Sequence, residues 1–288
     1  MEEDNKREVN ALIRLLDEPD ELMFGQIREK LISFGTDVIP SLEEAWENAF
    51  DPALQSRVED IIGKIQYETL YFQLNHWATF LSHDLLKGFY LVSTYQYPDL
   101  KEDSIRNQVD EIIRSAWLEI NTDLTALENV KVLNHILFEY QKFSGNRTNL
   151  HAPQNSFVNT LLETKKGSPL SLGILYIILA QRLHIPVYGV NLPQHFVLAY
   201  TREITEEKMK EENVLFYINP FSKGSVFSRF ELEMFIRQLK IEAKPYFFLP
   251  CSHNDMIRRL INNLAFSYRK LGHTEKVKDL EGLLPALE

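Results

Sequence analysis

The residues of this chain that could do chemistry gather between Lys165 and Tyr200, in KKGSPLSLGILYIILAQRLHIPVYGVNLPQHFVLAY. A Gly-Ser-Pro turn leads into an apolar run that predicts a helix, and two strand-like runs follow at 187–192 and 196–200. His195 stands where the second strand begins. A helix N-terminus that faces a histidine on a strand is an arrangement in which a nucleophile meets its base. Ser168 and Ser171 are the hydroxyl-bearing residues at that helix start.

The chain before this stretch is expected to be helical. Residues 1–70 carry apolar side chains at helical spacing, interrupted by turns, and predict four short helices. The phrases LIRLLDEPD and VIPSLEEAW are similar to HEAT-type repeats. Two repeats are few for a free-standing solenoid, so we expect this part to pack as a cap, with protein docking as the alternative.

A polar stretch, SGNRTNLHAPQNS, covers residues 144–156 between predicted helices. A loop of this length inside a compact domain is often functional. Asn155 and the serine after it could cap the helix that follows. His151 is either a solvated loop histidine or part of the rim of a cleft near His195.

After the central stretch, residues 214–218 predict a strand that ends at Asn219. The tail from about 253 contains LAFSYRKLGHTEKVKDLEGLL, which has the spacing of small, aromatic and glycine residues found in a tetratricopeptide (TPR) helix pair. We therefore expect three parts: a helical cap at 1–70, a core at 71–250 and a helix pair at 251–288.

Composition excludes several classes of protein. The 288 residues carry a net charge of −10, which weighs against nucleic acid or an anionic membrane as a partner. Cys251 is the only cysteine, so neither an internal disulfide nor a cysteine-based zinc site is expected. No apolar stretch is long enough to span a bilayer and no leader is visible, so we expect a cytoplasmic protein. We expect no metal and no cofactor.

Several motifs together resemble one family. GSPLSLGILY, the run RLHIPVYGVNLPQHFVL and the later INPF resemble the SirB-type transglutaminase-like proteins, which are commonly labelled regulators of sirC expression and carry TPR parts. The resemblance covers about residues 70–288. It implies an α+β fold, mostly helical, in which a helix packs on a small antiparallel sheet as in papain and transglutaminases. It also implies a triad of cysteine, histidine, and asparagine or aspartate, with His195 in the second place and Asn219 in the third.

The first place of that triad lacks its nucleophile. Counting back along the helix from the His184-Ile185-Pro186 turn places Pro169 where active relatives carry cysteine. Ser171 lies two residues further on, which is a rotation of about 200° around a helix. Ser168 precedes the helix, where a serine is expected to act as the N-cap.

Two hypotheses of function follow. The first is a non-catalytic protein-interaction or regulatory module on a degenerate transglutaminase-like fold, with a protein as partner and an oligomeric state left open. Its binding residues would come from Pro169, Ser168, His151, Asn155 and Gln194. The second is a hydrolase or acyltransferase acting on an amide or ester, with Ser171 (or Ser168) as nucleophile, His195 as base and Asn219 as the residue that orients the imidazole.

Overall fold

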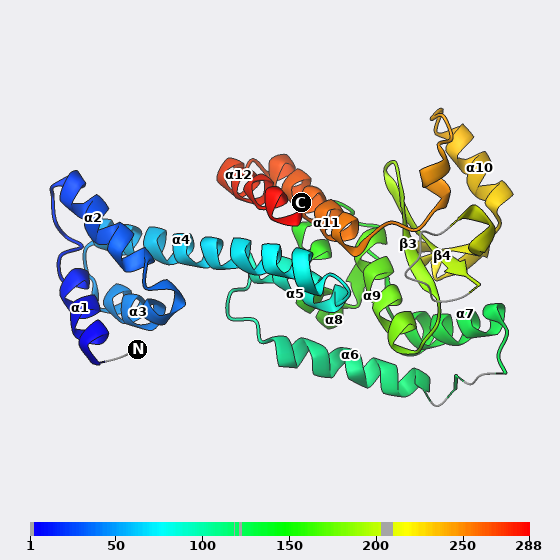
Figure 1. The fold of residues 1–288 in the computed structure, drawn as a ribbon, viewed down its shortest axis with the longest axis horizontal. Helices are drawn as coiled ribbons and strands as arrows, with labels where there is room; N and C mark the ends of the chain where they lie inside the picture. The colour runs from blue at the N-terminus through cyan, green and yellow to red at the C-terminus, as the bar shows by residue number, and fades with distance from the viewer. Residues whose placement is uncertain (1–2, 118, 121–122, 203–209) are drawn as a thin grey trace. The chain divides into compact units, whose positions relative to one another are not determined.

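A computed structural model describes residues 3–117, 119–120, 123–202 and 210–288 (Figure 1). The chain divides into two compact units, Met1–Gln73 and Leu74–Glu288. Helix α4 (Pro52–His76) runs through the boundary between them. The predicted division of the chain at residues 70 and 250 stays a prediction.

The first unit is built from α1 (Glu3–Ile13), α2 (Glu21–Ile32), α3 (Ile39–Asn48) and the beginning of α4. Asp20 caps α2 by accepting hydrogen bonds from the backbone N–H groups of the next turn. Arg57 of α4 donates to the carbonyl oxygens of Leu16 and Glu18, at 2.9 and 2.7 Å. These helices enclose one apolar cluster, which includes Val9, Leu16, Ile27, Leu31, Leu42, Val58 and Ile61. Their HEAT-type character stays a prediction.

Helix α9 (Pro169–Arg182) lies at the centre of the second unit, and its side chains are buried from Leu170 to Ala180. A helix that is apolar all round must be covered on every side. Helices α5 (Leu85–Thr94), α6 (Glu102–Trp117), α8 (Val158–Thr164) and α11 (His253–Leu271) pack against it, and so do strands of the main sheet (Figure 1). Helix α7 (Ala126–Asn134) reaches α9 through Asn134, which accepts a hydrogen bond from Tyr176, and α12 (Thr274–Leu283) packs on α11.

The main sheet is antiparallel, in the order β3 (Val187–Leu192), β4 (His195–Thr201), β5 (Val214–Asn219) and β6 (Ser225–Phe227). Strands β3 and β4 form a tight hairpin in which Leu192 pairs with His195. Gln194 in its turn has a left-handed backbone, with φ of 60°. Proline followed by a residue with positive φ fits a type II turn. The strands predicted at 187–192, 196–200 and 214–218 agree with β3, β4 and β5 to within one residue.

The two faces of the sheet meet different elements. Phe196 points to α9, where a Cβ on Gly173 would lie 2.6 Å from the phenyl ring, and a Cβ on Gly189 would lie equally close. Side chains alternate along a strand, so Val197 and Ala199 face the other side. There they join Leu232 and Ile236 of α10 (Arg229–Gln238) in a second apolar cluster. His195 shares the α10 face because it is two residues from Val197.

The fold class is the predicted one, α+β and mostly helical with a small antiparallel sheet. A separate parallel pair, β1 (Ser144–Gly145) and β2 (Lys166–Gly167), joins the polar 144–156 stretch to the start of α9. Across the described residues, no helix is both long and apolar enough to cross a membrane. The expected TPR-type pairing of α11 and α12 stays a prediction, although the two helices do pack together.

Candidate functional site

A pocket of about 390 Å³ opens where α9 begins and β4 starts. Apolar side chains form most of its wall, and a few polar groups converge on it, which is the usual character of a ligand pocket. The lining residues come from α9, β4, β5, β6, α10 and the turn after β5: Pro169, His195, Phe196, Val197, Asn219, Phe221, Phe227, Glu231, Leu232 and Phe235.

The imidazole of His195 is half-buried in this pocket. It packs edge-to-face on Phe235 of α10, with 4.7 Å between ring centroids. Burial lowers the pKa of His195 below its ordinary 6.5, and the positive charge of Arg259 lowers it further. The ring is therefore neutral at pH 7, with one nitrogen able to donate and the other able to accept. Within the part of the chain that the structure describes, neither nitrogen has a hydrogen-bond partner.

Arg259 of α11 holds the hairpin that carries His195. Its guanidinium donates to the side-chain oxygen of Asn191 at 3.1 Å and to the carbonyl oxygen of Leu192 at 2.9 Å. Leu192 is the strand partner of His195. Burial lowers the pKa of Arg259, whose charge lies behind the pocket wall.

Asn219 ends β5 on the same face of the sheet as His195. Extending the β4–β5 register from the pair of Leu198 and Ile218 places Asn219 opposite Val197, diagonal to His195. Its Oδ1 accepts from the backbone N–H groups of Phe221 at 3.0 Å and Ser222 at 3.2 Å. These two bonds fix the amide orientation and leave its amino group as the donor. No hydrogen bond to His195 is present in the described structure, so Asn219 does not orient the imidazole here.

Ser168 and Ser171 form a closed capping box at the start of α9. The Oγ of Ser168 accepts from the backbone N–H of Ser171 at 3.1 Å, and the Oγ of Ser171 accepts from the N–H of Ser168 at 2.9 Å. Ser171 is fully buried, and neither serine lines the pocket. Pro169, between them, is the residue of the helix start that reaches the pocket wall.

The remaining residues expected at the site lie elsewhere. Asn155 is buried and donates to the carbonyl oxygens of Asn149 and Leu150, so it holds the loop together rather than capping a helix. The expected cap is wrong: helix α8 begins at Val158, whose N–H bonds the Oγ of Ser93 at 2.8 Å. His151 is exposed and packs on Phe266.

Gln194, the last of the expected binding residues, and the single cysteine also lie outside the pocket. Gln194 occupies the exposed turn next to His195 but is not a lining residue. Cys251 bonds the edge of β3 through its N–H, 2.8 Å from the carbonyl oxygen of Gly189. Burial raises the pKa of Cys251 to about 12, with a smaller contribution from Asp255, so the thiol stays protonated.

The α10 wall of the pocket is the part that sequence reasoning missed. Glu231, Leu232 and Phe235 of α10 form this wall, and Phe227 of β6 lies beside them in the lining. Ser228 and Glu231 cap α10 reciprocally, and this Ser-x-x-Glu spacing is a visible sign of a helix start. The signal predicts the helix but not the face of the sheet that it covers.

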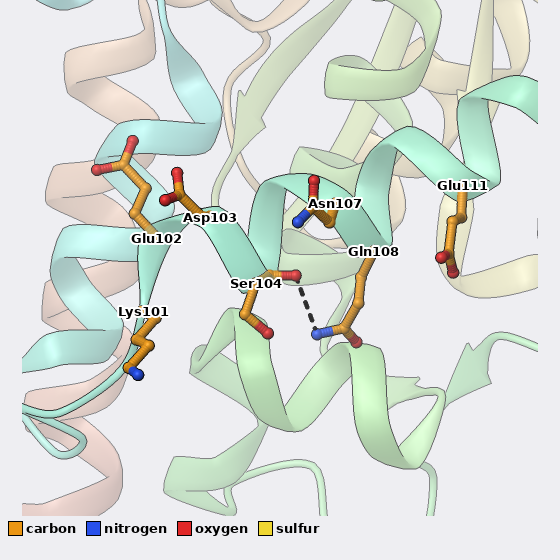
Figure 2. Close-up of a pocket in the computed structure, with 7 residues that line it drawn as sticks. All are labelled: Lys101, Glu102, Asp103, Ser104, Asn107, Gln108 and Glu111. Atoms are coloured by element: carbon orange, nitrogen blue, oxygen red, sulfur yellow. Dashed lines mark hydrogen bonds between the residues drawn. The ribbon is translucent and has the colours of Figure 1, made fainter.

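A second hollow follows one exposed side of α6 (Figure 2). Its side chains fan out from a single helix and do not converge, and Gln108 bonds back to the carbonyl oxygen of Ser104 at 3.3 Å. It therefore lacks the shape of a site. Among the described residues, no group of three or more His, Cys, Asp or Glu side chains could hold a metal ion.

Comparison with known families agrees with this geometry. Residues 103–262, more than half of the chain, match the family model described as the transglutaminase-like superfamily. The chain belongs to the transglutaminase-like superfamily. The matched region runs from α6 into α11, and it includes Pro169, His195 and Asn219 together with the sheet that carries them.

The curated relatives of this transglutaminase-like chain include bacterial UPF0162 proteins and a mammalian F-box protein. UPF0162 proteins from two strains of Xylella fastidiosa, 9a5c and Temecula1, are 29% and 30% identical over 193 residues. The aligned part is 64% of this chain and 64% of each relative, so the chain spans just under two thirds of their length. F-box only protein 21 of Homo sapiens is 30% identical over 106 residues, 37% of this chain and 17% of that protein. No solved structure matches the chain.

Proposed function

We propose that this chain is a non-catalytic protein-interaction or regulatory module whose binding site is the pocket at the start of α9. One observation carries the proposal. The helix start presents Pro169 to the pocket that contains His195 and Asn219, and none of the described residues that line it has a hydroxyl or a thiol. Proline suits the first turn of a helix because it has no N–H to leave unpaired, but its side chain is no nucleophile.

A Ser171–His195–Asn219 hydrolase is the second candidate, and a neutral histidine with a free nitrogen would serve it as a base. That mechanism requires Ser171 to leave its capping box and reach the pocket. Such a movement would leave the buried N–H of Ser168 without its partner, at a cost of about 1–3 kcal/mol. The resting geometry therefore favours binding over acyl transfer.

The first experiment restores the missing group by Pro169→Cys in a Cys251→Ser background. A thiol at a helix N-terminus beside a histidine has a lowered pKa. We expect iodoacetamide to alkylate the introduced thiol near neutral pH, faster than it alkylates Cys251 in the unaltered chain. His195→Ala in the same background should slow the reaction. A thiol that reacts no faster than Cys251 would mean that position 169 does not face His195.

The second experiment tests catalysis in the unaltered chain with a fluorophosphonate probe. We expect no labelled serine, because Ser168 and Ser171 are closed on each other. Labelling of Ser171 that disappears with His195→Ala would replace the proposal by the hydrolase.

A further inference from the structure

Basic side chains lie at the border of the pocket, although the net charge of the chain is negative. We call Arg147, Lys166 and Lys223 the basic rim; all three side chains are exposed. Arg147 lies over the ring of Phe221, with 5.8 Å from its guanidinium carbon to the ring centroid, and Phe221 lines the pocket. Lys223 follows in the same turn. In a chain with a net charge of −10, the basic rim is a local reversal of sign.

The parallel β1–β2 pair lies against the pocket wall, and Lys166 belongs to it. Lys166 pairs with Ser144, and the neighbouring Gly145 pairs with Gly167. A Cβ on Gly145 would overlap the ring of Phe221, so β1 lies directly against that ring. Lys166 also stands three residues before Pro169 at the pocket wall.

The basic rim is not neutralised by the protein itself. Among the described residues, none of its three side chains forms an ion pair. Among the described residues, Arg259 likewise forms no ion pair: its partners are the amide oxygen of Asn191, the backbone carbonyl of Leu192 and the ring of Phe196. Some other cations of the described residues, including Lys87, Arg106 and Arg182, do pair with carboxylates.

Helix capping can explain the position of only one of the three rim residues. Lys223 has φ of 55°, a left-handed conformation that favours glycine, and it ends the short 3₁₀ turn Pro220–Ser222. A lysine at a helix end can be explained by the helix dipole. That reason does not apply to Arg147 or Lys166, which lie beside and within two-residue strands.

The polar groups inside the pocket complete the pattern. Asn219 offers an amino group, since its oxygen is committed to two backbone N–H groups. The pocket therefore offers a hydrogen-bond donor to an acceptor atom of a ligand. Glu231 lies on the α10 wall, where its carboxylate accepts from the N–H and hydroxyl of Ser228. Negative charge on a ligand is accordingly favoured on the β1–β2 side and disfavoured on the α10 side.

We infer that the pocket binds an acidic segment of a protein partner, with a large apolar side chain inside the pocket and flanking carboxylates on the basic rim. The inference rests on the proposed function and specifies its partner. A pocket of about 390 Å³ lined mainly by aromatic and aliphatic groups suits such a side chain. Nucleic acid fits less well, because its affinity comes from many phosphate contacts along a basic stripe, and the rim is short.

The test is fluorescence anisotropy with a labelled short peptide in which one phenylalanine is flanked by aspartate and glutamate. Two matched peptides replace the phenylalanine by alanine, or the acids by asparagine and glutamine. We expect the parent peptide to bind more tightly than both, and its affinity to fall as salt is added, because exposed charges are screened.

Protein variants identify the surface. The double change Arg147→Glu and Lys166→Glu should weaken binding about tenfold, since two exposed attractions become repulsions. Lys278→Glu in α12 makes a charge change of the same sign outside the pocket and should leave affinity unchanged. Lys223→Gly removes one rim charge while relieving the left-handed backbone, so it should weaken binding without lowering thermal stability.

Several results would overturn the inference. These are equal binding of the acidic and the neutral peptide, no binding of either, an affinity unchanged by the rim variants, or tighter binding of a single-stranded DNA oligonucleotide. Each leaves the proposed function standing, because that fails on a different readout, the labelling of Ser171 by the fluorophosphonate probe.

Discussion

The ring of His195 is kept neutral by its surroundings more than by any single charge. Phe235 covers one edge of the imidazole, and Arg259 supports the hairpin behind it. Because burial is the larger cause of the lowered pKa and Arg259 the smaller one, access of water should control the titration. A neutral imidazole can donate to a carbonyl of a ligand or accept from an N–H.

Truncating the covering ring tests this account of His195. Phe235→Ala exposes the imidazole to water, so the pKa of His195 should rise toward its ordinary 6.5. An NMR titration of the His195 ring protons measures the shift. Phe266→Ala removes a ring that packs on His151 and should leave the titration of His195 unchanged. An unaltered pKa in Phe235→Ala would assign the lowering to Arg259.

At the scale of elements, Phe196 sets how closely α9 and the sheet approach. Its ring occupies a space that exists because positions 173 and 189 lack side chains. The helix carries Pro169 and the strand carries His195, so this contact also sets the separation of those two residues. Cores packed at this density resist even one added methyl group.

Adding a methyl group at position 173 tests how closely α9 and the sheet are packed. Gly173→Ala would place a Cβ 2.6 Å from the ring of Phe196, and it should destabilise the protein by about 1–3 kcal/mol in urea unfolding. Gly25→Ala in α2 is the matched control, because its added Cβ would point into open space. It should stabilise by about 0.4–1 kcal/mol. Equal effects at both positions would show that the ring moves aside.

The elements that could be predicted from sequence are those with local signals. The Ser168-Pro169 start, the apolar run and the proline turn at Pro186 delimit α9, and alternation delimits β3 and β4. The roles of Ser171 and Asn155 could not be predicted, because each depends on a hydrogen bond that forms only when the loop folds. The position of α10 depends on packing of Leu232 against the sheet, which no local pattern encodes.

At the scale of the whole molecule, charge is unevenly placed. The chain is strongly acidic, yet its basic rim borders the pocket. Elsewhere in the second unit, Asp84, Glu102, Lys87 and Arg106 form a network that joins α5 to α6. Stability should therefore depend on pH through partly buried histidines and, at lower pH, through these carboxylates.

The expected pH profile has two steps. Burial lowers the pKa values of His195 and His253 below 6.5. The unfolded chain then binds more protons than the folded one below that pH, and the free energy of unfolding falls as pH drops from about 7 to 5. His253→Asn, which keeps a donor toward the carbonyl oxygen of Ser82, should reduce this slope. A free energy that stays flat between these values would contradict the prediction.

A second step belongs to the carboxylates. Burial alone would raise the pKa values of Asp84 and Glu102, but bonds from Arg106, and from Lys87 to Glu102, hold both below their ordinary 3.8 and 4.5. Their contribution is present above those values and is lost as pH falls further. Urea unfolding at a series of pH values should show Arg106→Met flattening this lower step while leaving the upper one.

The capping box of Ser168 and Ser171 has a kinetic consequence. Because the two serines bond each other's backbone N–H groups, the first turn of α9 is complete before any partner arrives. The binding surface is therefore preorganised, and no helical turn has to become ordered when a partner binds. Association rates should then vary little among peptides that fit the pocket, and differences in affinity should appear as differences in residence time.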